Sequence, residues 1–439
     1  MFRIDRRQLV LLGSCSFLVV NPLPAAADPT PECNVGPGVN STECGANSAA
    51  TGNNATAVGN GATASGVNAT GVGASSTAAG NGSVAMGGVN PASGVATNAA
   101  GTVSLAIGAG ARTTAAATAG TAIGPNALSS NVGALALGGR TQATALGATA
   151  LGNESAATAD YSLVVGYQGT ASSAGAIAIG RTTQASGLAA AALGEAAAAS
   201  GENAIALGVA SQASGLASSA LGWQANASGI ASTALGHNTV ADNIGTTAVG
   251  VAARAQAAGA TSVGRLSGAS GVASTAVGAS ASATATNSVA LGSGSVANQA
   301  NTVSVGAAGA ERRIVNVAAG TAGTDAVNLA QLQALNASLG QGLAGVQTQL
   351  DTIFDLRTRD RRDMKQGVAA AVAMADAPMP SAPGRISYTL NGAIFRGEAA
   401  MGGSFLYRLQ GDAVFAIGGG FSYAGNKNSA ARIGIAGEF

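Results

Sequence analysis

The side chains of this 439-residue chain that could carry chemistry are few and far apart. Only 9% of the residues are charged, 3% are aromatic and one is histidine, whereas glycine occurs 66 times. The charged residues between positions 46 and 300 occur singly, so no acid, base and nucleophile share the spacing of a catalytic group. A net charge of +1 does not indicate the basic surface that nucleic-acid binding requires. We therefore expect a protein that is not an enzyme, needs no cofactor or metal, and has no nucleic-acid partner.

Cys33 and Cys44 are the two cysteines that lie beyond the leader described below. In an oxidising compartment we expect them to form a disulfide that closes a small loop in the N-terminal tip segment, 28–45. Such a loop would add about 2 to 3 kcal/mol of stability. A metal or redox role is disfavoured because no histidine or third cysteine lies nearby in the sequence.

Residues 1–27 have the pattern of a secretory signal peptide. Basic residues precede an apolar run over 9–20, and a small-residue stretch follows, so we expect cleavage between Ala27 and Asp28. The apolar run is shorter than the roughly 20 residues that a membrane-spanning helix needs. The residues up to Cys15 weakly resemble a lipoprotein cleavage box, although the apolar run continues past that cysteine.

A repeat of fourteen residues organises the stretch 124–306, and looser copies precede it. Each copy ends with an aliphatic residue and glycine, as at Leu207-Gly208. This period predicts a β-solenoid head over 46–300, with two short strands and two turns in each coil. The longer gap between Gly87 and Gly124 predicts an inserted loop.

The repeat also predicts which side chains point into the coil. We expect the aliphatic residue before the glycine, such as Leu207, to point inward, with the alanine five positions after the glycine, such as Ala213, on the opposite wall. One wall of the coil would then carry large side chains and the opposite wall small ones. The alanine two positions before the glycine, such as Ala206, would face outward and pack against sister chains, because so narrow a coil buries too little apolar surface alone. Glycine at the half-way point, such as Gly201, would permit a close backbone approach.

Two side chains interrupt the small residues of the repeat. His237 and Trp223 each follow a repeat glycine, in neighbouring coils. We interpret His237 as a solvated turn residue, and Trp223 either as incidental or as a binding anchor.

The pattern changes over 301–328, which contains the runs Glu-Arg-Arg-Ile-Val-Asn-Val at 311–317 and Gly-Thr-Ala-Gly-Thr-Asp-Ala-Val-Asn at 320–328. This segment resembles the neck of trimeric autotransporter adhesins, the family typified by the Yersinia adhesin. In that family a left-handed parallel β-roll head narrows onto a coiled-coil stalk. The resemblance identifies the neck residues Glu311, Arg312, Arg313, Asn316, Asp325 and Asn328. We further predict that Asp325 caps the N-terminus of the next helix.

Apolar residues at spacings of three, four and seven from Leu332 onward predict an α-helical coiled-coil stalk. We assign 329–377 to this stalk and to a pore helix of small residues, which prolines from Pro378 onward should end. Charges crowd between Asp351 and Lys365. Salt bridges between chains are one interpretation, and contact with lipid head groups is the other.

The last segment, 378–439, contains four stretches of alternating apolar and small or polar residues, each typical of a transmembrane strand. Four strands cannot close a membrane barrel, and an eight-stranded barrel from two chains would be filled by its own side chains. Three chains would form a 12-stranded transmembrane β-barrel with a lumen, so we expect a homotrimer. Phe439 resembles the terminal aromatic residue that the barrel-assembly machinery recognises.

The resemblance implies a non-enzymatic adhesin of a Gram-negative bacterium, secreted by the type V route and anchored in outer-membrane lipid. Its anchor would trimerise and assist export, and its head would attach to host extracellular matrix proteins, collagen-like ones included, or to cell surfaces, as a virulence factor. In the Yersinia relative a related repeat is associated with collagen binding. The candidate matrix-binding repeat here is Asn287, Ser288, Val289, Ala290, Leu291, Gly292 and Ser295.

Alternative interpretations remain for the repeat and for the whole chain. A competing interpretation is that the candidate repeat is only the packing code of the β-roll. The protein could instead be a structural protein for self-association or surface shielding, or an exporter whose anchor matters more than its passenger.

Overall fold

The computed structural model describes residues 33–425 and 428–438. The predicted cleavage site Ala27/Asp28 and the predicted assembly signal Phe439 lie outside the described residues. The chain divides into two compact units, Met1–Arg313 and Ile314–Phe439, which are described separately.

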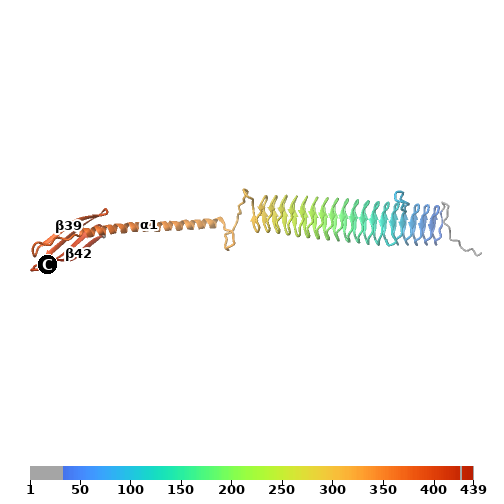
Figure 1. Ribbon diagram of the computed structural model, residues 1–439. Helices are drawn as coiled ribbons and strands as arrows, with labels where there is room; N and C mark the ends of the chain where they lie inside the picture. The colour runs from blue at the N-terminus through green and yellow to red at the C-terminus, as the bar shows by residue number, and fades with distance from the viewer. Residues whose placement is uncertain (1–32, 426–427, 439) are drawn as a thin grey trace, which may run out of the picture. The chain divides into compact units, whose positions relative to one another are not determined.

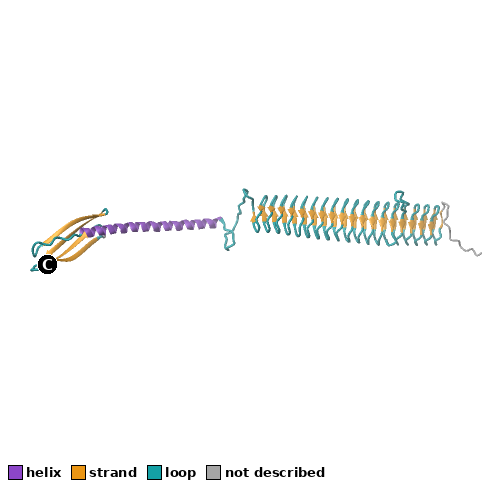
Figure 2. Cartoon of the chain, viewed as in Figure 1, coloured by secondary structure: helices purple, strands orange, loops and turns teal. Residues whose placement is uncertain are grey.

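The first unit is a stack of coils, each with one strand of mostly three residues and one of two residues (Figures 1 and 2). The three-residue strands form the first sheet, and the two-residue strands form the second sheet. Neighbouring strands in either sheet pair in parallel with a shift of one repeat, as Ile205 pairs with Ala191 and Ser219. The predicted β-solenoid with two strands and two turns in each coil is therefore confirmed.

The strands of the first sheet are β1 (Cys33–Val35), β2 (Thr42–Cys44), β4 (Thr56–Val58), β6 (Thr70–Val72), β8 (Val84–Met86), β10 (Leu105–Ile107), β12 (Thr121–Ile123), β14 (Leu135–Leu137), β16 (Thr149–Leu151), β18 (Leu163–Val165), β20 (Ile177–Ile179), β22 (Ala191–Leu193), β24 (Ile205–Leu207), β26 (Ser219–Leu221), β28 (Thr233–Leu235), β30 (Thr247–Val249), β32 (Thr261–Val263), β34 (Thr275–Val277), β36 (Val289–Leu291) and β38 (Val303–Ser304).

The strands of the second sheet are β3 (Ala49–Ala50), β5 (Thr63–Ala64), β7 (Thr77–Ala78), β9 (Asn98–Ala99), β11 (Arg112–Thr113), β13 (Leu128–Ser129), β15 (Gln142–Ala143), β17 (Ala156–Ala157), β19 (Thr170–Ala171), β21 (Gln184–Ala185), β23 (Ala198–Ala199), β25 (Gln212–Ala213), β27 (Asn226–Ala227), β29 (Val240–Ala241), β31 (Arg254–Ala255), β33 (Gly268–Ala269), β35 (Ser282–Ala283) and β37 (Val296–Ala297).

The N-terminal end of the stack is closed by a hairpin. Strand β1 pairs antiparallel with β2, and a disulfide joins Cys33 to Cys44 in that pair. Because β2 already pairs in parallel with β4, the first coil begins at Thr42 rather than at residue 46. The insertion expected after Gly87 lies between β8 and β9, and its loop stands out from the stack in Figure 1.

The core of the coil differs from our expectation. Alanines two positions before the repeat glycine, such as Ala178 and Ala206, are fully buried, whereas Leu207 is 44% exposed. The inward and outward assignments of these two positions were therefore wrong, although the inward alanine of the second sheet, such as Ala213, was correct. In a three-residue strand only the central side chain points inward, and the two sheets lie so close that Val164 is the largest side chain fully buried there.

Glycines permit this close approach. At Gly201 an added Cβ atom would lie 2.6 Å from the carbonyl carbon of Gly215 in the next coil. The expected role of this half-way glycine in a close backbone approach agrees with that spacing. Both turns also contain a residue in the left-handed region, as at Asn203 (φ 55°) and Ala210 (φ 54°), whose N–H groups donate to carbonyls of the preceding coil.

The second unit begins with a neck that lacks regular secondary structure, followed by helix α1 (Leu329–Ala373). Asn328, not Asp325, is the N-cap, so our N-cap assignment was wrong. Asp325 instead closes a turn, accepting hydrogen bonds from the N–H groups of Thr321 and Ala322, both at 2.9 Å. The helix ends at Ala373, before the predicted 377, because the following segment leaves the helix to run along the sheet described next.

Four antiparallel strands complete the unit: β39 (Ile386–Phe395), β40 (Glu398–Arg408), β41 (Val414–Tyr423) and β42 (Ser429–Glu438). They pair in sequence order, and β39 and β42 are the edges. The four predicted strands are thus present. Among the described residues, no helix is both long and apolar enough to cross a membrane.

Candidate interaction surfaces

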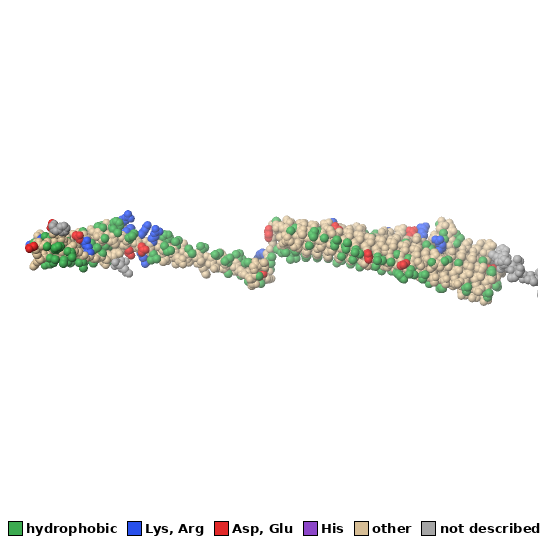
Figure 3. All heavy atoms as spheres, turned by 60° about the horizontal axis from the view of Figure 1, so that its bottom comes forward, with side chains coloured by type: hydrophobic (Ala, Val, Ile, Leu, Met, Phe, Trp, Pro, Cys, Tyr) green, Lys and Arg blue, Asp and Glu red, His purple; other side chains and the backbone are tan. Residues whose placement is uncertain are grey.

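The outer face of the first sheet is an extended apolar surface of the head. Side chains on either side of each buried alanine point outward, and Ile205, Leu207, Leu235 and Leu291 are each exposed by 44–48%. The corresponding positions of the second sheet are polar or small in most coils, as at Gln184 and Gln212. The head therefore has one apolar face and one largely polar face. Figure 3 shows hydrophobic side chains in a row along the stack.

The two turns of the coil also differ. The first turn, which precedes the strand of the first sheet, carries exposed aliphatic side chains in many coils, such as Leu188, Leu216, Ile230 and Ile244. The second turn, which follows the repeat glycine, carries aromatic and charged side chains in the middle of the stack. Residues directly after the glycine there are Tyr167, Arg181, Glu195, Val209, Trp223, His237, Val251 and Arg265.

Side chains at the second turn form ladders from coil to coil. The rings of Trp223 and His237 stack with centroids 4.6 Å apart and planes inclined by 6°. Arg181 forms an ion pair with Glu195. The sequence placed His237 and Trp223 at the same position of neighbouring coils, but we did not predict that their rings stack. Their common position in the repeat was the signal that could have revealed the row.

A further ladder lies one residue later in the second turn. Glu154 accepts hydrogen bonds from Gln168 Nε2 and Arg140 Nη1, each at 2.8 Å. These bonds, that from Gln168 first, lower the pKa of the Glu154 carboxyl group below its ordinary value.

The candidate matrix-binding repeat lies at the C-terminal end of the stack, and much of it is internal. Ser288, Ala290 and Ser295 are fully buried, and the hydroxyl groups of the two serines donate to the carbonyls of Ala285 and Leu291. Asn287 lies in a turn, where its amide donates to the Asn301 side chain (2.9 Å). Of the seven residues, Val289 and Leu291 point to the apolar face, and Gly292 has no side chain. This burial favours the packing interpretation for Ser288, Ala290 and Ser295.

Arg312 closes the C-terminal end of the head. Its guanidinium group donates to Ser295 Oγ (2.8 Å), to the carbonyl of Val305 (2.6 Å) and to the carbonyl of Ser293. These acceptors belong to the last turns of the stack, where no further coil follows. Arg312 therefore satisfies backbone groups that a next coil would otherwise bond.

The other predicted neck residues serve local structure. Glu311 accepts a hydrogen bond from the N–H of Gly309, which lowers the pKa of its carboxyl group, and Arg313 is exposed. Asn316 lies in the left-handed region with φ 61°. Asn328 and Gln331 form a capping box.

Gln331 was not singled out from the sequence. Its side chain also bonds both backbone groups of Gly320, each at 2.9 Å. Glutamine three positions after asparagine was the signal for this box.

Helix α1 carries the apolar stripe predicted from its sequence. Leu332, Leu335, Leu339, Val346 and Ile353 are all more than half exposed in the single chain. A helix of 45 residues with such a stripe needs partner helices.

The four-stranded sheet has one apolar face and one face that holds the end of the helix. Tyr388, Leu390, Ile394 and Ile433 are exposed by 76–88% on the outer face. On the other face Ala369, Ala370 and Ala373 of the helix pack against the sheet. The outer pattern is the one expected of lipid-facing strands.

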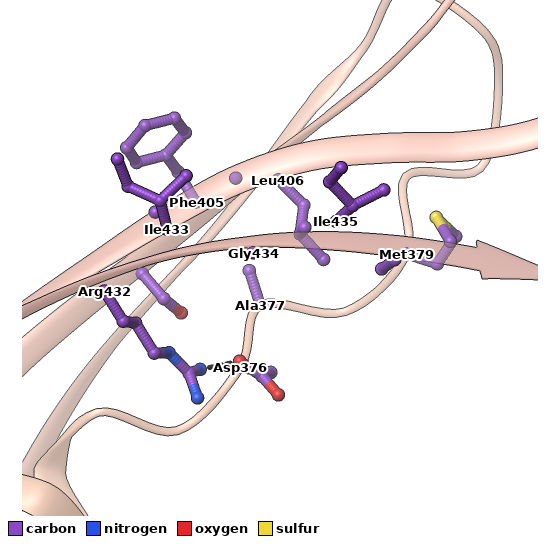
Figure 4. Close-up of a pocket in the computed structure, with 13 residues that line it drawn as sticks. Asp376, Ala377, Met379, Phe405, Leu406, Arg432, Ile433, Gly434 and Ile435 are labelled. Carbon is purple, nitrogen blue, oxygen red and sulfur yellow. Dashed lines mark ion pairs between the residues drawn. The ribbon is translucent and has the colours of Figure 1, made fainter.

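Polar side chains of the inner face hold the segment after the helix. Ser404 Oγ donates to the carbonyl of Ala375 (2.6 Å), and Arg432 forms an ion pair with Asp376. A cavity of about 400 Å³ lies beside this ion pair, with Met379 and Leu406 also in its lining (Figure 4). Its one charged pair positions the chain and provides no nucleophile with an adjacent base. Over residues 33–425 and 428–438, no group of His, Cys, Asp and Glu side chains could hold a metal ion.

Comparison with known proteins finds family models that match the head and the stalk of this chain. A family model described as the YadA head domain repeat matches overlapping segments that together span 38–62, 64–88, 129–183, 185–239 and 269–308. A second model, described as the coiled stalk of trimeric autotransporter adhesin, matches 313–353. A search of curated proteins finds no significant match.

One matching solved structure is the collagen-binding domain of the Yersinia adhesin YadA. It is 32% identical in sequence, and the match covers 40% of this chain and 86% of that one, with a TM-score of 0.30. The head and stalk models together cover more than half of the chain, and the head model matches residues that form the β-solenoid observed here. The chain therefore belongs to the family of YadA-like trimeric autotransporter adhesins.

Proposed function

We propose that this protein is a homotrimeric adhesin of the outer membrane, whose C-terminal sheet anchors it and whose head makes the contacts at the cell surface. The observation that carries this proposal is a series of unpartnered apolar faces. They lie on the first sheet of the head, along the stripe of α1 and on the outer face of the C-terminal sheet. Exposed apolar surface of this extent marks association sites.

Sister chains would cover the first two faces, and lipid would cover the third. Twelve strands from three chains form a closed barrel that leaves no edge strand such as β39 or β42 unpaired. Its lumen would take the small-residue ends of three helices. Such an anchor would need the leader peptide and the barrel-assembly machinery, and it would assist export of the head.

A cysteine cross-linking experiment on full-length chains in the outer membrane tests this arrangement. Leu207→Cys lies on the apolar face of the head, and Gln212→Cys, its matched control, lies on the polar face of the same coil. Oxidation should join chains through position 207 and leave chains with cysteine at 212 unjoined. In mild detergent the native protein should also run near three times the chain mass and dissociate on boiling. Equal cross-linking at both positions, or a monomer in mild detergent, contradicts the proposal.

The host ligand is a separate part of the proposal. The related domain is a collagen-binding one, so we propose a collagen-like matrix ligand for this head as well. Val289 and Leu291 would face sister chains, so matrix contacts would have to come from the turns and the polar face. Cells that display the chain should bind immobilised collagen, and Asn287→Ala should weaken the binding if the candidate repeat contributes. Binding that depends on display but is unchanged in Asn287→Ala would assign this repeat to packing.

Self-association is the second candidate function, because the burial of Ser288, Ala290 and Ser295 leaves little of the candidate repeat able to contact a matrix ligand. Displaying cells that clump but bind no matrix protein would support it over matrix attachment.

A further inference from the structure

One side of helix α1 is marked by its contacts with the C-terminal sheet. Arg362 lies 3.8 Å from Glu398, and Gln366 Nε2 donates to the same carboxylate at 3.0 Å. Ala369 and Ala373 pack against the strands on this side. We call it the wall side of the helix, and the opposite side the axis side, because sister helices of a trimer would meet there.

Apolar residues follow the axis side along the helix. With about 100° of rotation per residue, Val346, Ile353, Met364 and Val368 all lie on the side opposite the wall contacts. All four are exposed in the single chain. The apolar row therefore runs both before and after the charged stretch that begins at 351 and ends at 365.

Three charged residues interrupt this apolar row. Arg357, Asp360 and Arg361 lie within about 60° of the axis direction and are exposed in the single chain. Over residues 33–425 and 428–438, none of the three has an ion-pair partner, whereas Arg359 on the wall side pairs with Asp355 at 2.9 Å. The partners of these three charges must therefore come from sister chains or from solution.

The three charges leave an excess of positive charge in a trimer. Each chain contributes two arginines and one aspartate, so three guanidinium groups remain uncompensated around the axis. Arg357 and Arg361 are about 6 Å apart along the helix, so their long side chains can reach one point on the axis. Unpaired charges between packed helices are costly, and an anion from solution would offset that cost.

We propose that Arg357 and Arg361 of three chains bind one small tetrahedral oxyanion, such as inorganic phosphate, on the axis of the helix bundle. The proposal rests on the homotrimer of the proposed function, because each chain supplies only a third of the site. Guanidinium groups bind oxyanions through bidentate hydrogen bonds. A tetrahedral oxyanion has a threefold axis along each of its bonds, so three of its oxygens match three equivalent chains. The bound anion ties the helices together where they leave the sheet.

The phosphate of a lipid head group is the other source of the same chemistry. Lipid would surround the trimer, so it could reach only the wall side of each helix. The arginines of the wall side are already paired, Arg359 with Asp355 and Arg362 with Glu398. The geometry therefore favours a free anion on the axis.

Binding of radiolabelled inorganic phosphate to the full-length protein, purified in an uncharged detergent, tests the proposal. Equilibrium dialysis should find one phosphate per three chains, and chloride at the same ionic strength should not displace it. Saturating phosphate should also raise the temperature at which the trimer dissociates by about 5 °C, because a ligand that binds only the trimer stabilises it. Absence of bound phosphate, or its displacement by chloride, would overturn the proposal.

Two further arms separate the axis from other positions. Micelles that contain a phosphorylated lipid, at the same concentration of phosphate groups, should not compete with the free anion, and competition would contradict an axial site. Arg357→Met should weaken phosphate binding at least about tenfold. Arg359→Met is the matched control, because it removes the same charge from the wall side and should bind phosphate like the native chain.

Asp360→Asn should have the opposite effect. It removes the carboxylate that competes with the anion for the guanidinium groups, so phosphate should bind about threefold more tightly. A variant that merely unfolds cannot bind more tightly, so this change of sign separates a binding site from a structural role. Native affinity in Arg357→Met, or weaker binding in Asp360→Asn, would refute the site.

Failure of this inference is distinguishable from failure of the proposed function. A native chain that is monomeric in mild detergent would overturn both. A native trimer that binds no phosphate would overturn the anion site alone.

Discussion

Replacing Gly201 by alanine should separate two coils of the head. The added Cβ atom would lie 2.6 Å from the carbonyl carbon of Gly215, whereas an ordinary contact begins at 3.4 Å. Because the carbonyl oxygen of Gly215 lies closer still, the two coils would have to part by more than about 0.8 Å, a sixth of the roughly 4.8 Å spacing between strands. That shift strains the hydrogen bond from the N–H of Gly201 to the carbonyl of Ala213, now 3.2 Å. Overpacking of this kind costs about 2 to 3 kcal/mol in each chain.

Thermal unfolding of the full-length protein measures this cost, and limited proteolysis locates it. We expect the midpoint of unfolding to fall by about 5 °C and new cleavage to occur near residue 201. Gly268→Ala is the matched control, because an added Cβ atom there meets nothing within 4 Å and the backbone is not left-handed. It should be neutral or stabilise the head by up to about 1 kcal/mol. If both variants unfold at the native temperature, the inference that contact between coils excludes a side chain at Gly201 is wrong.

Three other predictions concern single sites. Val103 is a β-branched residue at φ 54° with 64% exposure, so Val103→Gly should raise the free energy of unfolding by about 1 kcal/mol, and an unchanged or lower value in denaturant unfolding would contradict this. Arg312→Ala removes three hydrogen bonds at the end of the stack and should make residues near 293–305 sensitive to protease. Arg313 is exposed, so Arg313→Ala should not have this effect. Equal cleavage of the two variants would refute the capping role of Arg312. The N–H groups of Ala322 and Thr321 hold the pKa of Asp325 below its ordinary value of 3.8, so its contribution to the neck is present above that pH and is lost as the pH falls through the lowered pKa. Hydrogen exchange of the Thr321 and Ala322 amides should therefore accelerate in acid relative to an Asp325→Asn variant, and parallel pH profiles would refute it.

Most of the fold could be predicted from the fourteen-residue period. A fixed period requires stacked, equivalent coils, and alternation within each copy requires strands, so a solenoid with two strands per coil could be predicted from the repeat alone. The apolar stripe from Leu332 predicted a helix in the same way, and it is present as α1. The alternation from Ile386 onward predicted four strands, which are present as β39 to β42.

The candidate sites were predicted less well than the elements. The neck residues were found by resemblance, but the cap was placed at Asp325, because aspartate and asparagine are both good N-caps and the sequence alone does not say which one precedes the first helical turn. In the structure Asn328 is the N-cap, because its side chain and that of Gln331 form a capping box. Similarly, the repeat containing Asn287 could be located but its burial could not.

The sequence by itself determined the period, the order of head, neck, helix and sheet, and the scarcity of reactive side chains. Only the tertiary structure decided which side of each strand is inside. Alternation specifies that Ala206 and Leu207 point to opposite sides, but either side could be the core as far as the pattern goes. The distance between the two sheets resolves this ambiguity, because so narrow a coil accepts a methyl group and excludes a leucine. The aliphatic side chains must then lie outside, where they form the face that a single chain leaves uncovered.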